Sequence, residues 1–510
     1  MVLREGSRMN RTQLLDNDEN IAIAAYPQAG ETQRLRAGHL RFLRTIAESV
    51  GVQGPTGGVV IGAAILAGMS GGGTALVQVI AAIAMGFVAY AFVIFTRGFN
   101  SAGSVYGFTG AVVGPRFGFL SAWALMFVYI NFAGGVYASF ADEAQPAFAA
   151  IGLHLPWQIY ALVAFILVVI LAYLDIKISS TVILILEGAS MALITVVGVI
   201  IAAKTGYHGH AFRFAPFRTH GVPLAALGLG VVYSFSAFSG FEAAATLGEE
   251  SSRPRRTIPM AVALSLVVVA IYEIAVAAVV TNAFPSTKML AGSAVPLVSV
   301  TDHFVSPWVG VLVNFGAVVS SFGAALASAN GAARMLFALG RDGLGPKMLT
   351  WVSRRTGSPV GAVLWVAVAS FAFLVGFLHD GSATRAVALI LTYGADLILA
   401  AYGLVLIAAI VFTVKQRRSR LSTAILVVGL GIFIYIVKDT FVPFPAAPYN
   451  WDAYGALITL GIGLLLPVLS PKIRHGIGQS PLLKVGATAL ISSPGRKTKS
   501  GPSSTQGTAL

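Results

Sequence analysis

The feature that most constrains this chain is a succession of apolar stretches, each long enough to cross a bilayer as a helix. A membrane-spanning helix needs about 20 consecutive apolar residues. Stretches of this kind lie at residues 44–69, 74–96, 117–141, 157–174, 178–203, 222–247, 258–283, 307–337, 360–379, 385–414, 422–438 and 452–470. Only 11% of the residues are charged, whereas soluble domains carry about 25%. The sequence therefore predicts an all-α integral membrane protein with 12 transmembrane helices.

The segments outside the spans set the predicted topology. Residues 1–43 are polar, and residues 471–510 form a Gly-, Ser- and Lys-containing tail that we expect to be disordered. An even number of spans places both termini on one side, where most of the 34 lysines and arginines also lie. The positive-inside rule makes that side the cytoplasm, so we expect a plasma (inner) membrane protein with both termini cytoplasmic. The net charge of +14 then reflects topology and anionic lipid, with no nucleic-acid partner.

Two of the apolar stretches are interrupted by glycine and small polar residues. The first reads GVQGPTGGVVIGAAILAG, from Gly51 to Gly68, and the second reads VVYSFSAFSGFEAAATLGEES, from Val231 to Ser251. A helix break in hydrocarbon leaves backbone N–H and C=O groups unpaired, at a cost of several kcal/mol each. Such breaks persist where they line a cavity or hold a ligand, and a pair in corresponding positions points to a transporter's substrate site.

The positions of the breaks indicate an internal repeat. The first five spans, residues 44–203, begin with a broken helix that enters from the cytoplasm. The next five, residues 222–414, begin with a broken helix that enters from the opposite side. We therefore expect a 5+5 inverted repeat with broken helices 1 and 6. Two appended helices at 422–470 complete a transporter domain over residues 44–470.

Three motifs carry a resemblance to a known family. The stretch SGFEAAATLGEESSRPRRTIPMAV, from Ser239 to Val262, resembles a signature of the amino acid–polyamine–organocation permease superfamily. Residues 328–363 resemble the loop after that family's eighth span, and residues 101–123 resemble the start of its third. The resemblance covers about residues 40–470 and implies amino acid uptake by alternating access. The first break departs from the family, because it reads Gly-Pro-Thr-Gly-Gly where many members have a Gly-x-Gly type.

The first break is the predicted site for a substrate carboxylate. The half-helix is expected to restart near Gly58, where its N-terminus offers free N–H groups and the positive end of a dipole. Such an end binds anions, and glycine lets the backbone approach the ligand. The alternative is that the glycines only allow close helix packing. The residues assigned to substrate here are Gly54, Pro55, Thr56, Gly57 and Gly58.

The second break is the predicted site for a substrate ammonium group. The outer half-helix is expected to end near Ser236 and to expose carbonyl oxygens, which suit a cation. The resemblance places an aromatic gate at this break, for which Phe238 is the candidate; ordinary packing is the alternative. The residues assigned to substrate here are Ser236, Phe238, Ser239 and Gly240.

Ionisable residues within spans are costly and usually functional. Glu187 lies near mid-membrane in its span and is the candidate carrier of a coupling proton, with Glu273 and Asp396 as further candidates. Sodium is the rival ion, because the hydroxyls of Ser320 and Ser321 can coordinate a hard cation. Exchange without an ion is the third possibility.

Four further residues are candidates for gating or structure. Glu242 follows the second break and is expected to bond backbone N–H groups there. Glu249 and Glu250 stand beside Arg253, which predicts inner-gate ion pairs that break during cycling. The alternative is a solvated loop whose charges only set the orientation of the protein in the membrane.

Several function classes are excluded. The chain has no cysteine, so thiol catalysis and cysteine-bound metals are ruled out. It has no HExxH, phosphate-loop or G-x-S-x-G motif, and we expect no enzyme activity, cofactor or metal. The sequence predicts a proton-coupled secondary active transporter of amino acids. The alternatives are a polyamine or organic-cation transporter, an amino acid exchanger, and a receptor or assembly subunit without transport.

Overall fold

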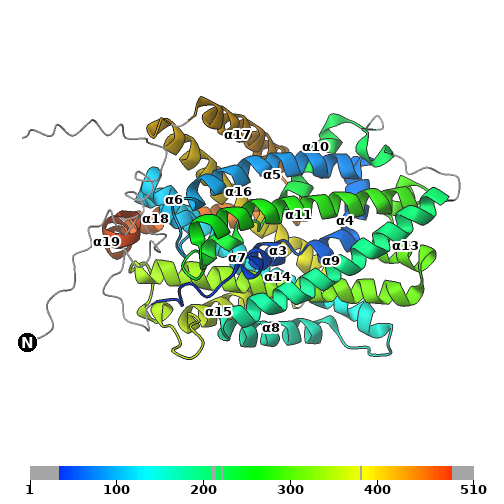
Figure 1. The fold of residues 1–510 in the computed structure, drawn as a ribbon, viewed down its shortest axis with the longest axis horizontal. Coiled ribbons are helices and arrows are strands. Elements are labelled where there is room, and N and C mark those ends of the chain that lie inside the picture. The colour runs from blue at the N-terminus through cyan, green and yellow to red at the C-terminus, as the bar shows by residue number, and fades with distance from the viewer. Residues whose placement is uncertain (1–33, 208–213, 220–221, 379–381, 418, 485–510) are drawn as a thin grey trace, which may run out of the picture.

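The computed structural model describes residues 34–207, 214–219, 222–378, 382–417 and 419–484. Within these ranges the fold is helical, with one isolated bridge between Leu40 and Ser251 and no strand. The long helices lie side by side as an elongated bundle (Figure 1). Their bounds are α3 (Phe42–Gln53), α4 (Pro55–Ser70), α5 (Thr74–Thr96), α6 (Val105–Val112), α7 (Pro115–Ala149), α8 (Trp157–Tyr173), α9 (Ile176–Tyr207), α10 (Leu224–Ala237), α11 (Pro254–Ala283), α12 (Thr287–Ala291), α13 (Pro296–Phe304), α14 (Pro307–Arg341), α15 (Val360–Phe377), α16 (Ala383–Lys415), α17 (Arg420–Phe441), α18 (Asn450–Leu469) and α19 (Pro471–Gln479), with short 3-10 helices η2 (Ala215–Phe217), η3 (Ala243–Leu247) and η4 (Lys347–Thr350).

The predicted spans agree with the observed helices. In the described part of the chain, 9 helical segments are long and apolar enough to cross a membrane, with α3 and α4 counted as one. Three further predicted spans are shorter apolar helices, namely α8, α10 and α15. The chain is therefore a multi-pass membrane protein.

The centre of the bundle is formed by α7 and α14, which each contain 35 residues. Helix α7 packs against both α14 and α16, and α14 also packs against α9. In contrast, most residues in the apolar stretches of α9, α17 and α18 are not buried. Ile185, Val196 and Val199 on α9, for example, are more than half exposed. An apolar exterior of this kind fits a lipid surrounding.

Three local features differ from the expectations. The first break is confined to Gly54, and α4 begins at Pro55 rather than near Gly58, because proline is well suited to the first helical position. After the second break the chain forms the short η3 instead of an α-helical half. The tail expected to be disordered forms α19 over Pro471–Gln479, at one end of the bundle (Figure 1). Residues 1–33 and 485–510, which complete the predicted terminal segments, lie outside the described residues.

Candidate functional site

The first break is a one-residue kink between α3 and α4. Gly54 adopts the left-handed conformation, with φ +53°, and this ends α3. A side chain there would be strained, and its Cβ would lie 3.2 Å from the Cβ of Ala324 on α14. Gly57 is half-buried and Gly58 is exposed. The first turn of α4 therefore presents accessible backbone at the predicted position.

Protein side chains already occupy the N–H groups of this turn. Glu187 Oε1, on α9, accepts hydrogen bonds from the Thr56 backbone N–H (3.2 Å) and from the Thr56 hydroxyl (2.9 Å). Ser320 Oγ, on α14, accepts one from the Gly57 N–H (3.2 Å). Glu187 Oε2 is buried and makes no hydrogen bond with the described residues. The structure thus brings Glu187 and Ser320 to the first break and places a protein carboxylate where a substrate carboxylate was expected.

Two further glutamates lie around the same turn. Ser321 donates to Glu143 Oε2 on α7 (2.7 Å). A Cβ built on Gly57 would lie 3.1 Å from Glu143 Oε1, and one on Gly58 would lie 3.8 Å from Glu273 Oε1. Glu143 was not among the predicted site residues, because the predicted span ended at residue 141, whereas α7 continues to Ala149. The acidic pair Asp142-Glu143 after an apolar run was the available signal.

The second break is held by Glu242. Helix α10 ends at Ala237, and Glu242 Oε2 accepts hydrogen bonds from the Gly240 N–H (3.1 Å) and the Tyr402 hydroxyl (2.6 Å). Its Oε1 accepts one from the Tyr129 hydroxyl (2.9 Å). Glu242 therefore bonds the N–H of Gly240, which precedes it, rather than N–H groups of an inner half-helix, and it also ties the break to α7 and α16.

The carbonyl groups at the end of α10 have partners in this structure. Ser236 O accepts hydrogen bonds from the Ser239 N–H (3.1 Å) and the Ser239 hydroxyl (2.6 Å). Phe238 is fully buried, so its ring packs inside the protein here. Ser236 is half-buried and lies at the accessible edge of the break.

The two breaks touch each other. A Cβ on Gly240 would lie 2.6 Å from Val52 Cγ1 and 3.1 Å from the Gln53 backbone nitrogen. Ser49 on α3 also bridges the two, since its hydroxyl donates to the Phe241 carbonyl (2.6 Å) and accepts from the Ala244 N–H (2.9 Å). The structure therefore joins the two segments that the sequence analysis assigned to one site.

Replacement of Gly240 by alanine is expected to damage this contact. Its φ is +104°, which disfavours any side chain, and overpacking costs about 1–3 kcal/mol in addition to that strain. We expect a lower unfolding midpoint in detergent and a loss of uptake. The matched control is Gly62→Ala on α4, where a Cβ would meet no atom within 4 Å. Equal midpoints for the two variants would contradict the prediction.

Comparison with known proteins decides the family. The Amino acid permease family profile matches residues 50–466. The chain belongs to the amino acid permease family. It is thus a member of the amino acid–polyamine–organocation superfamily and a transporter rather than an enzyme.

Individual relatives differ in substrate. The permease is 28% identical to a branched-chain amino acid permease of Bacillus subtilis, over 68% of this chain and 75% of that protein. It is 28% identical to the mitochondrial cationic amino acid transporter 3 of Arabidopsis thaliana, over 67% of this chain and 58% of that protein. It is 26% identical to a methylthioribose transporter of Bacillus subtilis, over 69% of this chain and 77% of that protein.

The predicted gate residues of the permease pair with α14 rather than with Arg253. Glu250 forms a two-point ion pair with Arg334, with Nε–Oε2 at 2.6 Å and Nη2–Oε1 at 3.2 Å. Glu249 also forms a two-point ion pair, with Arg341, in which Nη1–Oε2 is 2.9 Å and Nη2–Oε1 is 2.6 Å. Arg253 precedes α11 and is exposed. The expected pairing with Arg253 is therefore wrong, because α14 supplies the cations of both pairs.

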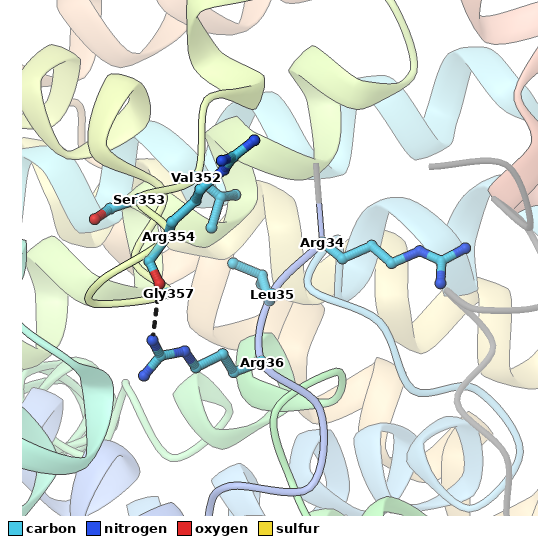
Figure 2. Close-up of a pocket in the computed structure, with 7 residues that line it drawn as sticks. All are labelled: Arg34, Leu35, Arg36, Val352, Ser353, Arg354 and Gly357. Carbon is cyan, nitrogen blue, oxygen red and sulfur yellow. Dashed lines mark hydrogen bonds between the residues drawn. The ribbon is translucent and has the colours of Figure 1, made fainter. Parts of the chain in front are cut away.

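A cavity of about 310 Å³ opens at the end of the permease where α3 begins, away from both breaks. Figure 2 shows it between the segment Arg34–Arg36 and the loop Val352–Gly357. Arg36 spans the two sides, because it donates to Asp175 (2.8 Å) and to the Arg354 carbonyl (3.0 Å). None of the predicted substrate residues lines this cavity.

Proposed function

We propose that this permease is a secondary active transporter that takes up amino acids by alternating access, driven by protons. The observation that carries the proposal is the contact between the breaks at Gly54 and Gly240, beside a buried glutamate with an unbonded oxygen. Paired breaks place a substrate between two parts of a bundle that can move relative to each other. In this proposal the fold is a 5+5 inverted repeat, and both termini lie on the cytoplasmic side of the plasma membrane.

Two features favour a proton over sodium. Glu187 touches the first break through Thr56, and its Oε2 is free to carry a proton. The hydroxyl of Ser320 is engaged by Gly57, and that of Ser321 by Glu143. A sodium ion would have to share these oxygen atoms with the existing hydrogen bonds and would need further ligands besides the two serines. Protonation of Glu187 therefore provides the simpler link between an ion and the break.

Uptake into proteoliposomes tests the proposal. The purified protein would receive a mixture of labelled amino acids under an inward proton gradient, then a sodium gradient, then with unlabelled amino acid inside. Accumulation under the proton gradient alone supports the proposal. Uptake that depends on sodium, or that occurs only in preloaded vesicles, overturns the proposed coupling to protons. Specific binding without transport by a folded protein overturns transport itself.

A second candidate function is transport of a basic amino acid or another organic cation. Glu143, Glu187 and Glu273 surround the first turn of α4, and none of them enters an ion pair formed within the described ranges. Carboxylates in a membrane interior need a proton or a cation. A cationic substrate supplies that charge, as the name of the Arabidopsis relative suggests for that protein.

The variant Glu143→Gln separates the two substrate classes. A substrate ammonium or guanidinium group that binds Glu143 gains a charged hydrogen bond of about 1.5–3 kcal/mol. Loss of this bond in the variant lowers the affinity for lysine or arginine by about 10- to 100-fold. Leucine affinity is expected to stay the same. Competition against labelled substrate in the proteoliposomes measures both. Equal changes for lysine and leucine would reject Glu143 as a selectivity residue.

A further inference from the structure

A second buried acidic group lies away from the substrate site, in the first half of the broken helix. Glu48 on α3 is 0% exposed, and its carboxylate forms no ion pair among the described residues, with the Asn330 amide as its polar neighbour. Arg334 and Glu250 are charged groups close enough to act on it, and each is 1% exposed. The three side chains form a buried cluster between α3, α14 and the segment that follows η3.

The cluster contains one cation and two carboxyl groups. Arg334 is committed to Glu250 through Nε and Nη2, and its Nη1 donates to the Asn330 carbonyl (3.1 Å). One guanidinium neutralises one carboxylate. An ionised Glu48 would therefore leave an uncompensated negative charge at a fully buried position, which costs several kcal/mol. Binding a proton removes this cost.

No other neighbour supplies the missing charge among the residues that the structure describes. From α14, the Asn330 amide donates one N–H to Ser179 (3.3 Å) and directs its other toward Glu48, but an amide carries no charge. From α7, the Tyr129 hydroxyl donates to Glu242 (2.9 Å). Asp175, ahead of α9, acts on Arg334 and Glu250 and adds negative charge. The surroundings of Glu48 therefore favour its neutral form.

The ion pair joins two parts of the transporter that have to separate. Arg334 belongs to α14, whereas Glu250 follows η3 and leads into α11, which packs against α3. In alternating access, the end of the bundle that is closed here opens in another state, and this pair then breaks. Water that enters at that moment reaches Glu48 as well.

We propose that Glu48 is a proton-binding site of the Arg334–Glu250 gate, which takes up a proton when the gate closes and releases it when the gate opens. This inference rests on the proposed alternating access. On opening, the O–H bond of the Glu48 carboxyl group breaks, the proton passes to the entering water, and the carboxylate remains solvated. By linkage, a higher pH on this side favours the open gate, because the open state binds fewer protons.

A thiol reporter tests the linkage without transport. The chain has no cysteine, so Ser251→Cys introduces a single thiol beside Glu250, at a position that is 4% exposed. A water-soluble maleimide then labels this thiol when the gate is open. Thiolate formation also speeds labelling as pH rises, so the measured quantity is the rate ratio between the reporter protein and the same reporter with Glu48→Gln.

We expect this ratio to rise with pH, by up to about tenfold per pH unit where one proton is exchanged. The Gln variant mimics the protonated group and keeps its gate closed, with labelling that follows thiol ionisation alone. Glu48→Asp retains a titratable group and should retain the pH dependence. The matched control is Asp142→Asn on α7, where Thr384 donates to the carboxylate (2.7 Å). It should behave as the parent reporter.

A pH-independent ratio would overturn the proposal, as would labelling of the Gln variant that changes with pH more than thiol ionisation accounts for. If Glu48→Gln fails to fold, the comparison of parent and Glu48→Asp still decides, because their ratio must change with pH when their proton affinities differ. The labelling needs no substrate. A protein that transports no amino acid but shows the expected ratio would reject the proposed function and retain the proton site.

Discussion

Replacement of Arg334 by methionine is expected to destabilise the permease strongly. Arg334 is the cation in a cluster with Glu250 and Glu48, and its side chain is 2% exposed. Removing one partner of a buried pair leaves an uncompensated charge and costs about 3–5 kcal/mol. Methionine has a similar volume, so the loss is one of charge and hydrogen bonds. Equilibrium unfolding in mixed micelles measures it.

The control for this prediction is a more exposed ion pair. Arg36 pairs with Asp175 at 2.8 Å, but its side chain is 35% exposed, and pairs of this kind contribute about 0–1 kcal/mol. Arg36→Met should therefore cost far less than Arg334→Met. The double variant Arg334→Met/Glu250→Leu should recover part of the stability, because it removes both charges of the pair. Equal losses for Arg334→Met and Arg36→Met would show that the cluster does not hold this end of the bundle together.

Helix positions and helix breaks were predictable because both are local properties. A run of apolar residues is sufficient to define a span, and Gly54-Pro55 marks the first kink by its own backbone chemistry. The start of the second half-helix was predicted too late in the chain, because the glycines after Thr56 suggested a longer break. Proline at the first helical position overrides them, since its φ is already that of a helix.

The partners of the charged residues were not predictable, because they come from distant segments. Glu250 has three arginines nearby in sequence, yet its partner Arg334 is 84 residues away. Glu143 lies beyond the predicted end of its span, so its approach to Gly57 depends on an extra length of α7. A hydropathy pattern contains no information about which helices touch. These contacts emerge only from the packing of α7 and α14.

Replacement of Glu187 by glutamine is expected to abolish proton-driven accumulation while leaving exchange intact. The amide oxygen of glutamine can still accept the hydrogen bonds of Thr56 that Glu187 Oε1 accepts now. The side chain, however, no longer binds and releases a proton. A gradient of one pH unit supplies about 1.4 kcal/mol, which supports about tenfold accumulation for one proton per substrate. We expect this ratio to fall to about one in the variant.

Exchange at equal pH distinguishes lost coupling from lost binding. In vesicles preloaded with unlabelled amino acid, Glu187→Gln should exchange labelled substrate at a rate close to that of the parent, because the kink at Gly54 is preserved. Glu273→Gln is the matched control, since its carboxyl group faces Gly58 without touching Thr56. It should keep its response to the gradient. Retained accumulation in Glu187→Gln would reject Glu187 as the carrier, and loss in Glu273→Gln alone would transfer that role to α11.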